Sequence, residues 1–267
     1  MNLVFLSSEI IHQIHLINEI HRRYPITKVF FQPPPDSKRS SFSEKLQKLT
    51  NPKKVRRYIR LVLRDLLFHN EDDKQREYES RMFFSGNEPK LESSIPIECV
   101  DSFNTPEGVE AVRKTEPDVI VVFGADILRG EILNVAKRGI LNIHRDILPN
   151  YRGGGLPFWV FYNRDFENLG VTVHVCTSQL DGGDIVGQRR YKLQVDDGIH
   201  TLRYKTTLVA EELLLDVLAA YENNTVDYQK QKPAKLWTSK DLTIVKEYRA
   251  RKNLRKYIET LKTANSV

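Results

Sequence analysis

The sequence contains only two cysteines and no long hydrophobic run. Cys99 and Cys176 lie far apart and neither belongs to a CxxC pair, so nothing supports a disulfide framework or a metal site. No stretch reaches the roughly 18 consecutive apolar residues that predict a membrane-spanning helix. The N-terminus, MNLVFLSSEI, lacks a basic leader. These absences predict a cytoplasmic protein with no membrane partner.

Charge of one sign is not in large excess either. The formal net charge is +6, with 28% charged and 40% hydrophobic residues among 267. This composition is typical of a soluble protein that can bury a sizeable core. The modest positive charge fits an anionic substrate, a nucleic acid or simply a basic surface.

Short apolar runs alternate with segments of helical periodicity. Apolar runs predict strands at residues 2–7, 27–32, 95–100, 119–124, 140–144, 169–176 and 184–194. Periodicity and capping signals predict helices at residues 9–23, 53–69, 105–118, 127–139, 198–222 and 250–262. This alternation predicts an α/β fold with three layers and a mainly parallel sheet.

Residues 36–95 interrupt the alternation, and we predict that they form a helical insertion. The insertion lies within a main domain of residues 1–222, which is followed by a C-terminal extension of residues 223–267. Ten basic residues fall between Lys38 and Arg64, against the single acid Glu44.

The helix expected at 53–69 carries many of these charges beside an apolar set at helical spacing: Ile59, Val62, Leu63, Leu66 and Leu67. Its basic face is suited to RNA or to a phosphorylated molecule. A solvated face is the simpler interpretation, because Tyr58 is the only aromatic residue between 53 and 64 available for stacking. A nucleic-acid partner is therefore not expected.

Two polar side chains end the strand ILNIH. Asn142 and His144 are two positions apart, so their side chains share one face, at the sheet edge where ligands of open α/β sheets bind. An isolated pair of this kind could simply cap the end of a strand. Asp181, in the later segment QLDGGDI, changes the interpretation because its loop can place a carboxylate against His144.

Together these three groups predict the transfer of a small acyl group. A carboxylate raises the pKa of a neighbouring imidazole, and an imidazolium beside an Asn amide can stabilise a developing oxyanion. Asp181 could also take a proton from an attacking amine. None of the serines Ser7, Ser8 and Ser178 lies in a nucleophile-elbow sequence, so we expect no covalent acyl-enzyme.

The motifs ILNIHRDILPNYRGG and GVTVHVCTSQLDGGDIVGQ resemble the 10-formyltetrahydrofolate-dependent formyltransferase family over about residues 119–215. That family includes the glycinamide ribonucleotide, methionyl-tRNA and sugar N-formyltransferases. The resemblance implies a Rossmann-type, formyltransferase-like catalytic domain. It also implies 10-formyltetrahydrofolate as the formyl donor.

The resemblance also implies roles for individual residues. The catalytic set would be Asn142, His144 and Asp181. The pterin of the donor would contact Ile127, Leu128, Gly182 and Gly183. The acceptor side would include His174 and, by its place before the glycines, Arg152, which could hold a phosphate or carboxylate or could brace the loop.

Departures from the family pattern bear on the acceptor. Arg145 and Asp146 replace the usual small pair after the histidine. The first strand is followed by SSEIIHQ and not by a glycine-rich phosphate loop, which argues against glycinamide ribonucleotide. The sequence leaves no room for the long C-terminal barrel of the tRNA enzyme. Elimination within the family therefore favours an amino sugar, nucleotide-linked, as the acceptor.

Three alternatives stay open. The chain could be a hydrolase that releases formate from the same donor, with water as the nucleophile. It could be one of the other two formyltransferases. It could also be a basic RNA-binding protein that keeps the fold without catalysis. We also predict a homodimer, without assigning it to particular residues.

Overall fold

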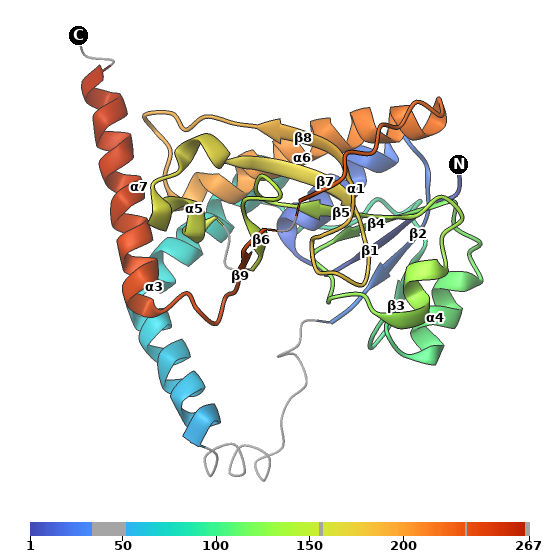
Figure 1. The fold of residues 1–267 in the computed structure, drawn as a ribbon, viewed down its shortest axis with the longest axis horizontal. Coiled ribbons are helices and arrows are strands. Elements are labelled where there is room, and N and C mark those ends of the chain that lie inside the picture. The colour runs from blue at the N-terminus through green and yellow to red at the C-terminus, as the bar shows by residue number, and fades with distance from the viewer. Residues whose placement is uncertain (34–51, 155–156, 233, 265–267) are drawn as a thin grey trace.

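The computed structural model describes residues 1–33, 52–154, 157–232 and 234–264. A seven-stranded sheet in the order β3-β2-β1-β4-β5-β7-β8 forms its centre (Figure 1). The strands are β1 (Leu3–Ser7), β2 (Ile26–Phe31), β3 (Ile97–Cys99), β4 (Val119–Phe123), β5 (Ile140–His144), β7 (Gly170–Val175) and β8 (Ile185–Arg190). The first five pair in parallel, whereas β7 and β8 pair antiparallel. The predicted α/β fold with a mainly parallel sheet is confirmed.

Helices cover both faces of this sheet, which explains why β1 and β4 are buried at every position. Leu3 and Phe5 of β1 pack with Leu16 on one face, and Val4 packs with Val109 on the other. The first face is covered by α1 (Ile11–His21) and α6 (Ile199–Glu222). The second face is covered by α4 (Pro106–Arg113) and the short 3₁₀ helix η1 (Gly130–Asn134).

The helix expected at 127–139 is not present. Only η1, residues Gly130–Asn134, is helical in this segment, because the side chain of Asn104 hydrogen-bonds to backbone groups just before η1. Asn104 donates to the carbonyl of Ile127 at 2.9 Å and accepts from the N–H of Arg129 at 2.7 Å. The chain is thereby held extended before η1, at the edge of the sheet.

The insertion contributes one long helix, α3 (Pro52–Phe84), which continues well past residue 69, where the expected helix ended. Residues 36–51 of the predicted insertion lie outside the described residues. Figure 1 shows α3 beside α7 (Ile244–Ala264) at one end of the molecule. The smaller elements are α5 (Phe158–Asn163), η2 (Phe166–Asn168), β6 (Arg152–Gly153) and β9 (Leu236–Trp237).

A third apolar cluster joins the C-terminal segment to the rest of the chain. Trp159 and Phe161 of α5 pack against Leu254 and Ile258 of α7. Arg251 of α7 is buried and pairs with three carboxylates, those of Glu71, Asp72 and Glu247. The limits of the catalytic domain and of the extension stay a prediction.

The apolar residues of α3 face outward at its N-terminal half. Ile59, Val62, Leu63, Leu66 and Leu67 are all exposed. On the same half, Arg60 donates to the carbonyls of Ser239, Lys240 and Leu242. Polar contacts to the C-terminal segment therefore hold this part of the helix. None of the described helices combines the length and apolar character needed to cross a bilayer.

Candidate active site

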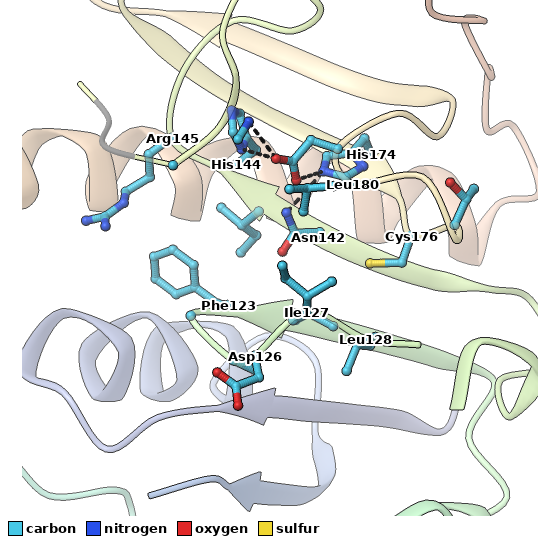
Figure 2. A pocket seen from close by; sticks show the side chains of 18 of the residues that line it. Phe123, Asp126, Ile127, Leu128, Asn142, His144, Arg145, His174, Cys176 and Leu180 are labelled. Carbon is cyan, nitrogen blue, oxygen red and sulfur yellow. Dashed lines mark hydrogen bonds and ion pairs between the residues drawn. The ribbon is translucent and has the colours of Figure 1, made fainter. Parts of the chain in front are cut away.

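A cavity of about 320 Å³ opens at the carboxyl ends of β4 and β5 (Figure 2). Its wall includes Phe123 and Gly124 at the end of β4, and Asn142 and His144 at the end of β5. The strand order reverses beside this point, because the chain crosses from β3 at one side of the sheet back to β4 beside β1. Ligand sites of open α/β sheets lie at such a reversal.

Asn142 and His174 face each other across neighbouring strands. They are register partners in β5 and β7, and the Asn142 amide nitrogen lies 3.0 Å from Nε2 of His174. Nδ1 of His174 donates to the carbonyl of Val175 at 2.9 Å, so Nε2 is free to accept from the amide. This arrangement leaves the second amide hydrogen and the oxygen of Asn142 for the cavity (Figure 2).

Asp181 lies between the two histidines of the cavity. One carboxylate oxygen is 3.7 Å from Nδ1 of His144, and the other is 3.5 Å from Nε2 of His174. The N–H of Gly153 donates to the carboxylate at 2.9 Å. Burial raises the pKa of Asp181, whereas the two imidazoles when they are protonated, and this N–H, lower it more. The pKa is therefore lowered and the group is a carboxylate.

His144 differs from our expectation of an imidazolium. Burial lowers the pKa of its imidazole, and the attraction of Asp181 opposes that effect without overcoming it. Nε2 lies 2.7 Å from the carbonyl oxygen of Tyr151, which can only accept, so Nε2 keeps its proton in either charge state. The atom that gains or loses a proton is therefore Nδ1, on the side of Asp181.

The loop that carries Asp181 is held by contacts from distant segments. Asp181 has a φ of +45°, a backbone conformation that costs energy for a residue other than glycine. A Cβ at Gly183 would lie 2.0 Å from the carbonyl oxygen of Val175, so only glycine fits there. Gln231 donates to the carbonyls of Asp181 and Gly183 at 3.2 and 2.5 Å.

The residues expected to contact the donor and the acceptor do not all line the cavity. Ile127 and Leu128 line the cavity, as does His174, whereas Gly182 and Gly183 shape the loop behind Asp181 without lining it.

Arg152 is buried and donates to the carbonyl of Leu180 at 2.6 Å. This bond joins Arg152 to the Asp181 loop, and its role toward the acceptor stays a prediction.

Sequence reasoning missed several residues of the wall. His12 and Gln13, at the start of α1, line the cavity because the segment after β1 ends at the same sheet edge. Their position after a buried strand was the available signal. Gln231 carried no signal, because nothing in the sequence near it predicts a contact with Asp181.

Among the described residues, no group of histidine, cysteine or carboxylate side chains is arranged to hold a metal ion.

Comparison with known proteins supports the resemblance noted from the motifs. Residues 88–218 match the family model described as formyl transferase, so the resemblance is confirmed over that range. A sugar N-formyltransferase from a Shewanella species is similar in structure, with a TM-score of 0.58 and 12% identity over 95% of this chain and 87% of that one.

Two further solved structures are similar. A 4-N formyltransferase from Francisella tularensis has a TM-score of 0.57 and 15% identity over 94% of this chain and 86% of that one. An N-formyltransferase from Helicobacter canadensis, solved with folinic acid and dTDP-3-aminofucose, has a TM-score of 0.55 and 16% identity over 94% of this chain and 79% of that one. At these identities the likeness establishes a shared formyltransferase-like fold.

Proposed function

We propose that this chain is an N-formyltransferase that moves the formyl group of 10-formyltetrahydrofolate to the amine of an amino sugar, nucleotide-linked. One observation carries the proposal: Asn142 and His144 of β5 meet Asp181, from the distant loop between β7 and β8, at the wall of one cavity. The ligands of the Helicobacter canadensis enzyme, folinic acid and dTDP-3-aminofucose, support this pair of substrates.

The donor would lie against the β4 end of the cavity. Gly124, Ala125, Ile127 and Leu128 line this side, and such small and apolar residues suit a flat heterocyclic ring. The carbonyl to be attacked would then face Asn142 and His144 across the cavity. Gly182 and Gly183 keep Asp181 against the histidines, and this is how they would support the donor side.

The proton of the attacking amine needs an acceptor, and the geometry offers Nδ1 of His144. As the amine nitrogen bonds to the formyl carbon, Nδ1 takes its proton and Asp181 stabilises the imidazolium that forms. The charged ring and the free amide hydrogen of Asn142 stabilise the negative oxygen of the tetrahedral intermediate. When the bond between carbon and the folate nitrogen breaks, Nδ1 returns the proton to that nitrogen.

The decisive experiment follows tetrahydrofolate formation with and without a panel of nucleotide-linked amino sugars. Release that depends on the amine supports transfer. Release without amine indicates the hydrolase. No release, together with tight, salt-sensitive RNA binding, indicates the RNA-binding alternative.

Substitution of the catalytic set tests the roles. His144→Ala and Asp181→Asn should each lower turnover by about 10² or more, as expected for loss of an acid–base or oxyanion-stabilising group. The matched control is His69→Ala, which removes an exposed histidine of α3. Near-normal turnover in His144→Ala would contradict the role assignment. A cytoplasmic location and a homodimer stay predictions from the sequence.

A further inference from the structure

A second cavity, of about 260 Å³, adjoins the candidate active site, and Arg145 lines both. Four arginines line this second cavity: Arg64, Arg76, Arg145 and Arg203. Asp72 is its only carboxylate among the described lining residues. The wall is therefore strongly positive in net charge, and it begins beside the residue that follows His144.

The nearby carboxylate of Glu79 attracts the guanidinium of Arg145 without bonding to it, so the charge of Arg145 is only partly compensated. No hydrogen bond or ion pair joins its guanidinium to another described residue, and burial and the nearby Arg203 lower its pKa from the ordinary value. Burial raises the pKa of Asp146, its neighbour, well above the usual range, which weakens the compensation that Asp146 gives to Arg145. A partly buried cation with no bonded partner favours an anionic ligand.

Arg64 and Arg203 are positioned by carboxylates that lie in or beside the cavity. Nε of Arg203 pairs with Glu79, which is fully buried, and no described residue bonds to its terminal nitrogens. Arg64 pairs with Asp72 at 2.8 Å and with Glu247 at 3.1 Å. The insertion helix α3 thus fixes Arg64 directly and Arg203 through Glu79.

We propose that this second cavity binds a phosphate or diphosphate group of the acceptor, and so places the acceptor amine beside His144. Planar guanidinium groups bind phosphate oxygens in pairs, and several of them together match an anion of multiple charge. The inference rests on the proposed function. It adds where the phosphate groups of the acceptor bind, and that Arg145 is the residue that joins the two binding regions.

The donor tail could supply an anion as well, but the placement favours the acceptor. Figure 2 shows Arg145 on the opposite side of the first cavity from Leu128, where the pterin is expected.

Calorimetric titration of the full chain with inorganic pyrophosphate tests the site without any turnover. Pyrophosphate should bind with one site per chain, and Arg145→Gln should weaken it on the order of tenfold or more, as for loss of charge-assisted hydrogen bonds. Arg76→Gln, whose side chain is 63% exposed and so tolerates change, should weaken it less. The matched control Arg113→Gln removes an equal charge from the exposed face of α4 and should leave binding unchanged.

Tetrahydrofolate binding, measured on the same variants, separates the two sources of anion. It should be unchanged in Arg145→Gln. The proposal is overturned if pyrophosphate does not bind, if Arg145→Gln and Arg113→Gln weaken it equally, or if Arg145→Gln weakens tetrahydrofolate instead.

Turnover separates this inference from the proposed function. With a phosphorylated amino sugar, Arg145→Gln should raise KM more than it lowers kcat. Pyrophosphate binding at Arg145 without any amine-dependent tetrahydrofolate release would leave the site standing and contradict the transferase assignment. Transfer to amino sugars at equal KM with and without phosphate would overturn the inference and leave the transferase assignment standing.

Discussion

Three histidines meet one cavity, and their surroundings separate their chemistry. His174 is oriented by the carbonyl of Val175 and accepts from Asn142. His144 is oriented by the carbonyl of Tyr151, so only its Nδ1 can gain or lose a proton. His12 is buried beside Glu79, and burial lowers its pKa from 6.5 to about 4. The same residue type thus serves three purposes, because burial and hydrogen-bond partners differ.

The lowered pKa of His144 predicts the pH dependence of transfer. Nδ1 must be unprotonated to accept the amine proton, and burial keeps it so down to a pH below the ordinary 6.5 of histidine. Activity should therefore hold through neutral pH and decline only below about 6.5. The pH profile of kcat/KM checks this.

A variant sharpens the assignment. Asp181→Asn removes the charge that raises the pKa of His144, so its residual activity should decline at a still lower pH. An acid limb at or above 6.5 in the native protein would show that another group controls the rate.

His12 predicts the pH dependence of stability. Its pKa is near 4 when folded and about 6.5 when unfolded, so protons bind the unfolded chain first as the pH falls. Between pH 7 and 4 this one group should remove about 3 kcal/mol from the free energy of unfolding.

Urea unfolding at both pH values checks the expectation for His12. His12→Gln should lose correspondingly less stability over this interval. His69→Gln, which changes an exposed histidine of α3, should behave like the native chain. Equal losses in the native chain and His12→Gln would refute the assignment.

Among the elements, the candidate active site depends on a sheet whose strand pairing changes from parallel to antiparallel after β5. The parallel strands β4 and β5 end at one edge, beside Asn142, and the antiparallel pair β7 and β8 returns the chain across it. The loop between β7 and β8 carries Asp181 back to His144. Gly183 permits this because the loop passes over the carbonyl of Val175.

Two adjacent glycines allow a matched test of this loop. At Gly183 an added Cβ meets a backbone carbonyl at 2.0 Å, so Gly183→Ala must shift the loop. A displacement of about 1 Å at a catalytic group can lower kcat by about 10². At Gly182 the nearest atoms, at 2.7 Å or more, belong to the flexible side chain of Gln179, so Gly182→Ala should lower kcat by less than about tenfold. Equal effects in the two variants would argue against the loop mechanism.

In the whole molecule, the insertion and the C-terminal segment are joined by direct contacts to the domain that holds the candidate active site. The helix α3 carries Glu79 to Arg203 and His12, and the segment after α6 carries Gln231 to the Asp181 loop. Both segments that look accessory in the sequence therefore position groups at the two cavities.

The buried charge of Arg251 predicts how strongly α7 is joined to α3. Arg251→Met leaves Glu247, which is 3% exposed, with fewer partners, and this should cost about 3 kcal/mol of unfolding free energy. Arg255→Met, at a side chain 58% exposed, should cost about 1 kcal/mol or less. Urea unfolding measures both, and equal costs would show that burial of Arg251 does not matter.

Much of the fold could be predicted because its signals are local. Unbroken apolar runs such as residues 119–124 predict strands buried on both faces, and β4 is buried throughout. The helix expected at 127–139 is absent because the side chain of Asn104, more than twenty residues away, hydrogen-bonds to the backbone of Ile127 and Arg129. The apolar set of α3 has a helical period, but the period alone does not say what covers it, and the structure leaves it exposed.

Local sequence patterns pointed to candidate groups: Asn142, His144 and Asp181 were predicted from their spacing and motifs. Only the tertiary structure decided their state and their neighbours. Packing lowers the pKa of His144, joins Arg152 to the carbonyl of Leu180 and gathers three further arginines beside Arg145. The physical reason is that desolvation and charge pairing depend on atoms contributed by distant segments. Local patterns carry the identity of a side chain but not the dielectric surroundings that set its charge.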